Sequence, residues 1–190
     1  MMDSMDALWA ISRHRGDAIV VTTMTANAEW PQVTKNPAYD LPLSGAMGKA
    51  SSLGLGLSLA RPERRVLVLD GDGSLLMNLG SLVTIAHVAP PNLYHFVFQN
   101  NVYRVSGGQP VPGAGKFSFV ALALAAGYAA AYDFQELEPL EMSLPQVLER
   151  PGPALICLQV PSLRERAPYP ITPTSAMLSR FREALAKAKI

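Results

Sequence analysis

Cysteine is nearly absent from the sequence, since Cys157 is the single one among 190 residues. One cysteine cannot close a disulfide within the chain, and with only three histidines the sequence shows no Cys/His spacing typical of structural zinc. Cys157 falls within the apolar segment 154–160, where a free cysteine usually acts as a small buried hydrophobic residue. These absences exclude a disulfide-stapled scaffold and a zinc-finger domain.

Charged residues are also scarce, at 16% of the sequence with a net charge of +1, while hydrophobic residues make up 49%. A chain without an excess of positive charge gives no electrostatic reason to expect nucleic-acid binding. The charged fraction is low for a soluble domain, so we expect another chain to cover part of the apolar surface. The length suits one α/β domain with a sizeable core, spanning residues 1–190.

Long hydrophobic runs are missing too. The most apolar segment, residues 121–131, is short and is interrupted by Gly127, whereas a bilayer span needs about 20 apolar residues. The first residues include Asp3 and Asp6 and contain no apolar stretch typical of a secretory signal. We therefore expect a cytoplasmic protein without a membrane span.

A glycine-rich turn stands out among the features that are present. The apolar segment 66–69 predicts a buried parallel strand, Gly71-Asp72-Gly73-Ser74 follows it closely, and residues 75–87 show helical spacing. The glycines permit a tight turn, and a helix N-terminus together with the Ser74 hydroxyl can bind phosphate. Asp72 would repel a phosphate unless a divalent cation lies between them. The sequence therefore predicts a metal–diphosphate site.

The next strand ends in a second polar pair. Residues 93–99 predict another buried strand, which ends in Asn100-Asn101. A right-handed crossover between the two strands would bring their carboxyl ends to the same edge of a sheet. Because an aspartate carboxylate and an asparagine amide both offer hard oxygen ligands, they suit Mg2+ or Ca2+.

Two other kinds of nucleotide-binding site share part of this pattern. A nicotinamide or flavin site needs a third glycine and an acidic residue about 20 positions later. The sequence lacks that glycine and has no Asp or Glu between Asp72 and Asp133. A P-loop needs a hydroxyl residue after Gly-Lys, but Gly48-Lys49 is followed by Ala50. Neither alternative fits.

The remaining segments predict alternating helices and strands. The helix at 5–14 should pack through Leu8, Trp9, Ile11 and Ser12, and the proline-rich segment 25–43 should form a loop. The helix at 44–60 is rich in small residues, which suit either close packing on the sheet or an interface with a cofactor. The further expectations are a strand at 18–22, a loop at 100–116, helices at 117–127 and 135–149, strands at 128–132 and 154–160, and a helix with a solvated basic face at 175–189.

Taken together, these motifs resemble the cofactor signature of thiamine diphosphate (ThDP) enzymes. The resemblance also covers Gly45-Ala46-Met47-Gly48 upstream and Ser106-Gly107-Gly108-Gln109-Pro110 downstream. From about residue 5 to residue 161, the chain most resembles the beta subunit of sulfopyruvate decarboxylase and the corresponding part of phosphonopyruvate decarboxylases. This resemblance implies a three-layer, doubly wound α/β fold with a mostly parallel sheet and helices on both faces.

The resemblance also implies roles for individual residues. The side chains of Asp72 and Asn101 and the backbone carbonyl of Tyr103 would bind Mg2+, and Asn100 would support the turn. Ser74 and the backbone amides around Gly73 would hold the diphosphate. The other residues implied to bind the cofactor are Gly45 through its carbonyl, Ala46, Met47 as an apolar support, Gly71 and Val105.

A substrate with an anionic tail would need cationic groups or N–H and O–H donors. Arg104, Ser106 and, less directly, Lys116 are the candidates in or next to the glycine-rich loop. Arg104 stands where many ThDP enzymes have glycine, so the loop geometry can differ from theirs.

No catalytic residue is expected in this chain. In the family, a glutamate from a pyrimidine-binding domain activates the cofactor, and this chain has no second domain of that size. Glu29 is the one mid-chain candidate on the N-terminal side, and we do not assign it this role. The resemblance therefore implies a Mg-ThDP-binding beta subunit of a heteromeric 2-oxoacid decarboxylase, with the glutamate on an alpha subunit. An acetolactate-synthase-like carboligase subunit and a non-catalytic regulatory subunit remain alternatives.

Overall fold

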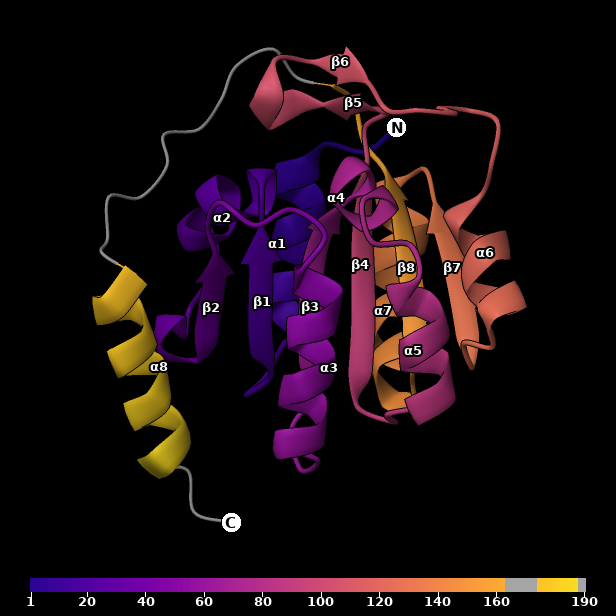
Figure 1. The fold of residues 1–190 in the computed structure, drawn as a ribbon. Helices are drawn as coiled ribbons and strands as arrows, with labels where there is room; N and C mark the ends of the chain where they lie inside the picture. Colours follow the sequence, from indigo (N-terminus) through magenta and orange to yellow (C-terminus); the bar gives the residue numbers. More distant parts are fainter. Residues whose placement is uncertain (163–173, 188–190) are drawn as a thin grey trace.

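A six-stranded parallel sheet forms the centre of the computed structural model, which describes residues 1–162 and 174–187 (Figure 1). The strand order is β2-β1-β3-β4-β8-β7, and every neighbouring pair is parallel. The strands are β1 (Ile19–Thr23), β2 (Asp40–Leu43), β3 (Val66–Gly71), β4 (Leu93–Gln99), β7 (Ala130–Phe134) and β8 (Ala154–Gln159). The α/β fold with a parallel sheet is thus confirmed.

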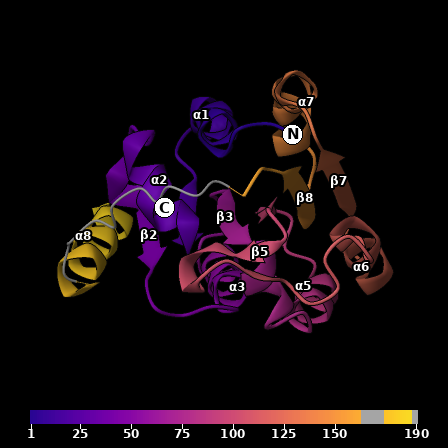
Figure 2. The ribbon, with the colours of Figure 1, turned by 90° about the horizontal axis from the view of Figure 1, so that it is seen from above.

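Helices cover both faces of this sheet (Figure 2). One face carries α1 (Ser4–His14) and α7 (Leu137–Glu149), and the other carries α3 (Ala50–Ala60), α5 (Ser81–Val88) and α6 (Phe119–Ala126). Alternate residues of β3 enter the two cores, because successive side chains of a strand point to opposite faces. Leu67 and Leu69 join the core under α1 and α7, while Val66 and Val68 join the core under α3 and α5.

The C-terminal helix α8 (Thr174–Lys187) packs beside β2 at one edge of the sheet (Figure 1). Met177 and Phe181 are buried there, while Arg180, Arg182 and Lys187 are exposed, as expected for a solvated basic face. Lys189 lies outside the described residues. Among the described helices, none combines the length and the apolar character needed to cross a membrane.

Two helix predictions were wrong at their boundaries. The expected helix at 75–87 is divided into α4 (Asp72–Leu76) and α5, because residues 77–80 form turns closed by short-range bonds such as Asn78 N to Leu75 O, 3.0 Å. The helix expected from residue 44 begins only at Ala50. Gly45 and Gly48 have φ values of +71° and +70°, which no right-handed helix contains.

The loop prediction for 25–43 was also wrong. This segment contains α2 (Thr25–Glu29), two short 3-10 turns and the edge strand β2. Pro42 lies within β2, where a missing N–H is tolerated because the strand is at the edge. Trp9, expected in the core, is 42% exposed because Leu8 and Ile11 occupy the inner side of α1.

Two further segments differ in detail from the prediction. The strand expected at 128–132 begins at Ala130, since the Tyr128 N–H still bonds to Ala123 O at the end of α6. The loop at 100–116 contains a small antiparallel ribbon of β5 (Val102–Tyr103) and β6 (Gln109–Pro110). This ribbon lies over the carboxyl edge of the sheet, above β4 (Figure 1).

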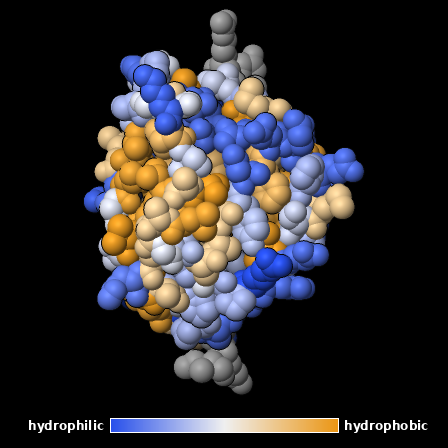
Figure 3. Space-filling view, turned by 90° about the vertical axis from the view of Figure 1, so that its right-hand side faces the viewer, coloured by the Kyte–Doolittle hydropathy of each residue, from blue (hydrophilic) through white to orange (hydrophobic). Residues whose placement is uncertain are grey.

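Apolar side chains gather on the side of the molecule where α5 and α6 lie (Figure 3). Of the large apolar side chains in and around these two helices, Met77, Val83 and Leu124 are exposed by 61%, 62% and 51%. An exposed apolar surface of this kind often marks an interaction site. It agrees with the low charged fraction of the sequence, and its cover by another chain stays a prediction.

The two glycines of α3 allow a test of how closely this helix packs. A Cβ at Gly54 would overlap Val68 Cγ2, whereas a Cβ at Gly56 would meet nothing within 4 Å. We expect Gly54→Ala to lower the free energy of unfolding by about 1–3 kcal/mol through overpacking. Gly56→Ala should raise it by up to about 1 kcal/mol, because alanine is the better helix former. Urea unfolding of both variants measures these changes. An equal change in the free energy of unfolding of the two variants would contradict the close contact between Gly54 and Val68.

Candidate functional site

The candidate site is a cleft at the carboxyl edge of the sheet, between the ends of β1 and β3. The chain leaves β1 toward β2 and leaves β3 toward β4, in opposite directions, and ligands of open α/β sheets bind at such a point. The residues that line the cleft are Met24, Thr25, Met47, Gly71, Asp72, Gly73, Ser74, Asn100, Val102, Tyr103, Arg104, Val105 and Ser106.

Asp72 connects the two predicted motifs. Its Oδ2 accepts a hydrogen bond from the backbone N–H of Asn101 at 2.6 Å, and its Oδ1 accepts one from Gly73 N at 2.7 Å. Burial raises the pKa of the Asp72 carboxyl above its ordinary value, while these N–H groups favour the carboxylate and act in the opposite direction. A cation bound at this carboxylate would offset the cost of its burial.

Asn101 follows β4 in the left-handed region, with φ at +63°. Asparagine is one of the few residue types other than glycine that adopt this conformation readily. Its side-chain Oδ1 accepts a hydrogen bond from Gln99 Nε2 at 3.1 Å. The neighbouring Asn100 Oδ1 accepts one from Val102 N at 3.0 Å, which closes the turn as expected. The Asn101 side chain itself is not among those lining the cleft.

Tyr103 covers Gly73. A Cβ built on Gly73 would lie 2.6 Å from Tyr103 Cδ1, so only glycine permits this approach of the ring to the backbone. The Tyr103 carbonyl, predicted as a metal ligand, accepts a hydrogen bond from Gly108 N at 2.9 Å. A carbonyl oxygen has two lone pairs, so this bond leaves one for a cation.

Ser74 joins the upstream motif to the site. Its Oγ accepts a hydrogen bond from Gly48 N at 3.0 Å, and Asn78 Nδ2 donates to Gly48 O at 2.8 Å. Because Ser74 accepts this bond, its own hydroxyl hydrogen can serve a ligand. Of the upstream residues, Met47 lines the cleft, whereas Gly45 and Ala46 do not.

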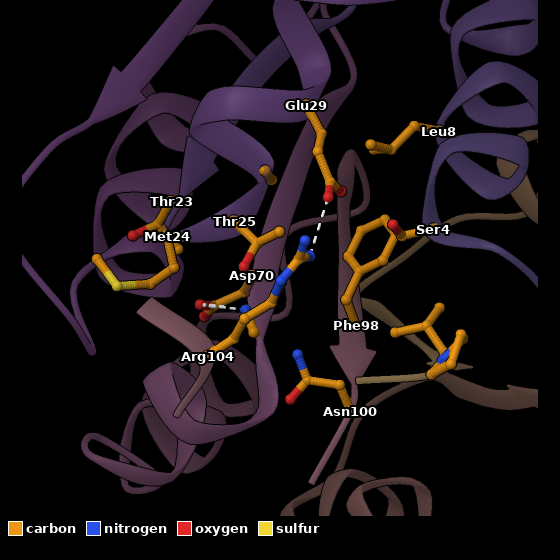
Figure 4. A pocket seen from close by; sticks show the side chains of 14 residues that line it. Ser4, Leu8, Thr23, Met24, Thr25, Glu29, Asp70, Phe98, Asn100 and Arg104 are labelled. Carbon is orange, nitrogen blue, oxygen red and sulfur yellow. Dashed lines mark hydrogen bonds and ion pairs between the residues drawn. The ribbon is translucent and has the colours of Figure 1, made fainter. Parts of the chain in front are cut away.

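Arg104 lines both this cleft and a second pocket, which is shown in Figure 4. Its Nη1 is 3.0 Å from Glu29 Oε1, and the side chains are only 9% and 7% exposed. The guanidinium charge predicted for a substrate is therefore offset by Glu29. Ser106 is exposed at the cleft, and Lys116 is exposed but does not line it.

Sequence reasoning missed Met24 and Thr25, which line both cavities. They follow β1 directly. The sequence feature that could have indicated them is the change from apolar residues to threonine at the carboxyl end of this strand, at Thr22, Thr23 and Thr25. Val102 was missed as well. Its neighbours Tyr103 and Val105 were identified only through the resemblance.

The residues at the cleft fit a magnesium–diphosphate group when they are taken together with the neighbouring Asn101, whose backbone N–H bonds to Asp72. A carboxylate, an amide oxygen and a backbone carbonyl are the hard oxygen ligands that Mg2+ prefers. The Ser74 hydroxyl adds a donor for phosphate oxygens. The N–H groups of Gly71 and Gly73 already donate to the carboxylates of Asp70 and Asp72, at 2.9 and 2.7 Å, so a phosphate would share these donors. Within residues 1–162 and 174–187, no group of three or more His, Cys, Asp or Glu could hold a metal, so amide and carbonyl ligands would be needed.

Comparison with known proteins gives a consistent result. Residues 19–158 match the family model described as "Thiamine pyrophosphate enzyme, C-terminal TPP binding domain". The chain is 38% identical over 144 residues to phosphonopyruvate decarboxylase of Streptomyces viridochromogenes, which covers 76% of this chain and 36% of that protein. It is 42% identical over 110 residues to sulfopyruvate decarboxylase subunit beta of Methanothermobacter thermautotrophicus, covering 57% of this chain and 58% of that protein.

A solved structure shares the fold. Benzoylformate decarboxylase from Polynucleobacter necessarius superposes with a TM-score of 0.72 at 20% identity, over 87% of this chain and 34% of that one. At this identity the likeness concerns the fold alone. The chain thus spans between about a third and somewhat over half the length of these proteins.

Proposed function

This chain belongs to the thiamine pyrophosphate enzymes, and we propose that it is the Mg2+- and ThDP-binding subunit of a 2-oxoacid decarboxylase. The observation that carries the proposal is the contact of Asp72 with the Asn101 backbone in the cleft at the switch point of the sheet. The substrate class follows from the relatives, two of which are named as decarboxylases of phosphonopyruvate and sulfopyruvate. The reaction would release CO2 and an aldehyde.

We propose that Asp72, Asn101 and the Tyr103 carbonyl hold Mg2+, and that Ser74 with the amides of Gly71 and Gly73 holds the diphosphate. Bound ThDP supplies an electron sink for the bond that breaks when CO2 leaves. The chain's own residues anchor the charged end of the cofactor and exclude water from it. The other residues proposed to bind the cofactor are Gly45, Ala46, Met47 and Val105, to which the cleft adds Met24 and Thr25.

The residues that activate the cofactor are proposed to come from a partner. The relative from Methanothermobacter is named as a beta subunit, and the phosphonopyruvate decarboxylase is a much longer chain. Glu29 is already paired with Arg104, which argues against an activating role. We propose that a separate alpha subunit brings the pyrimidine-binding domain and its glutamate, and that this chain acts as one diphosphate-binding domain.

Arg104 and Ser106 are the proposed contacts for an anionic substrate tail. Both line the cleft, but Arg104 would have to share its charge with Glu29. Because Glu29 offsets this charge, the proposal of a phosphonate or sulfonate tail rests on the substrates named for the relatives more than on Arg104.

The test begins with gentle purification of the complex from its own host and native mass spectrometry. We expect a second chain together with ThDP and Mg2+. The complex is then incubated with phosphonopyruvate and sulfopyruvate, and products are followed by NMR. A free aldehyde and CO2 support the proposal. A coupled ketol would instead indicate a carboligase, and a complex with neither cofactor nor turnover would indicate a regulatory subunit.

A further inference from the structure

A chain of side-chain hydrogen bonds reaches Asn101 from the far edge of the sheet. It connects the ends of three adjacent strands, β4, β8 and β7, through Gln99, Gln159 and Asp133. Gln159 Nε2 lies 3.1 Å from Asp133 Oδ1 and 3.2 Å from Gln99 Oε1. Gln99 Nε2 in turn lies 3.1 Å from Asn101 Oδ1.

The donor and acceptor chemistry fixes the direction of every amide in this chain. An ionised carboxylate only accepts hydrogen bonds, so Gln159 must turn its NH2 toward Asp133. The same NH2 lies against Gln99, which must therefore present its oxygen. Gln99 then has only its NH2 to offer to Asn101. The orientation follows from the network and from Asp133 as its anchor, because amide oxygen and nitrogen are otherwise interchangeable in shape.

Cys157 supports the same orientation. Its Sγ lies 3.1 Å from Gln99 Oε1. Burial raises the pKa of the Cys157 thiol to about 12, so the sulfur keeps its proton and acts as a donor. Two donors thus meet Gln99 Oε1, and a rotated Gln99 would place its NH2 against both of them.

The consequence falls on Asn101. With the Gln99 NH2 against it, the Asn101 side chain has to present its oxygen, and a rotated amide would bring two NH2 groups together. An NH2 group is no ligand for Mg2+, whereas a carbonyl-type oxygen can accept a hydrogen bond and bind a cation through its second lone pair. Hydrogen bonds from neighbouring side chains orient the ligands of metal ions in this way in many proteins.

We propose that Gln99 is a positioning residue, which with Gln159 and Asp133 holds the Asn101 amide oxygen ready for the metal. This rests on the proposed function, in which Asn101 is a ligand of Mg2+. Gln99 is 8% exposed, and burying an amide is costly compared with an apolar side chain of the same size. A role in orienting Asn101 accounts for an amide at this position.

The test is a double-mutant cycle that separates orientation from packing. Gln99→Met keeps the length of the side chain but removes the donor. We expect the Mg2+ concentration for half-maximal ThDP binding, measured by calorimetry on the purified complex, to rise about tenfold. In an Asn101→Asp background both oxygens of the side chain are equivalent, so Gln99→Met should then change the Mg2+ requirement by less than about twofold.

Asn92→Leu is the matched control. Asn92 is an equally buried amide just before the other end of β4, where it donates to Ser58 O, Arg61 O and Arg64 O. This change should lower the thermal midpoint without moving the Mg2+ requirement. If Gln99→Met does not fold, Gln159→Met should shift the requirement in the same direction.

The outcomes separate the two proposals. An unchanged Mg2+ requirement in Gln99→Met, or an equal effect in the Asn101→Asp background, would overturn the positioning role while Mg2+-dependent ThDP binding by the unaltered complex stands. If the unaltered complex itself shows no such binding, the proposed function fails, and this inference fails with it.

Discussion

Asp72→Ala should abolish Mg2+-dependent ThDP binding, with a loss of at least about 100-fold in affinity, or about 2.8 kcal/mol. The attraction between two unit charges 4 Å apart is about 4 kcal/mol at an effective dielectric constant near 20, and a divalent cation would lose more. The variant also leaves the Asn101 N–H without the carboxylate that now accepts it. Calorimetric titration of the complex with ThDP, with and without Mg2+, measures the loss.

Two further variants control this experiment. Asp72→Asn keeps an oxygen that can accept the Asn101 N–H, so it should stay folded while metal affinity still falls more than about tenfold. Asp17→Ala removes an exposed carboxylate, paired with Arg64 at the amino end of the sheet, and should leave binding unchanged. The assignment of Asp72 as a ligand fails if Asp72→Ala retains Mg2+-dependent binding.

Gly73→Ala should have the second largest effect. The added methyl group would overlap the Tyr103 ring, so the ring and the segment that carries the Tyr103 carbonyl must move. We expect the free energy of unfolding to fall by about 1–3 kcal/mol. Since the displaced carbonyl is a proposed metal ligand, ThDP affinity should fall as well. Urea unfolding and calorimetry measure the two effects.

A second substitution separates the overlap from other causes. The double variant Gly73→Ala/Tyr103→Leu lacks the ring but keeps the backbone carbonyl. Its loss of stability should therefore be smaller than the sum of the losses in the two single variants. Gly71→Ala is the matched control for stability, because a Cβ there meets nothing within 4 Å and φ is −103°. A loss of stability in Gly71→Ala equal to that in Gly73→Ala would contradict this explanation.

The meeting of Asp72 with Asn101 could be expected from sequence because it depends on topology alone. Two consecutive parallel strands with a right-handed crossover leave their carboxyl ends at one edge, whatever the details of packing. Buried strands such as β4 could also be predicted, because a continuous apolar run of this length is typical of a strand that is covered on both faces of a parallel sheet.

Features that depend on distant partners could not be predicted in this way. Glu29 and Arg104 are 75 positions apart, and nothing local in either segment indicates that they pair. The edge strand β2 has four residues, one of them Pro42, so its pattern resembles a loop. Helix α3 begins late because Gly45 and Gly48 have positive φ values. Tertiary contacts stabilise this conformation, for example the hydrogen bond from Gly48 N to Ser74 Oγ.

The packing of α8 beside β2 has a consequence for the behaviour of the chain in solution. An uncovered edge strand offers unpaired N–H and C=O groups that can recruit a strand from another molecule. At the β2 edge, α8 blocks such pairing, because it packs beside the strand through its buried side chains Met177 and Phe181. At the opposite edge, β7 instead carries the exposed charge of Asp133. Protection against aggregation is thus built differently at the two edges, by a covering helix at one and by a charge at the other.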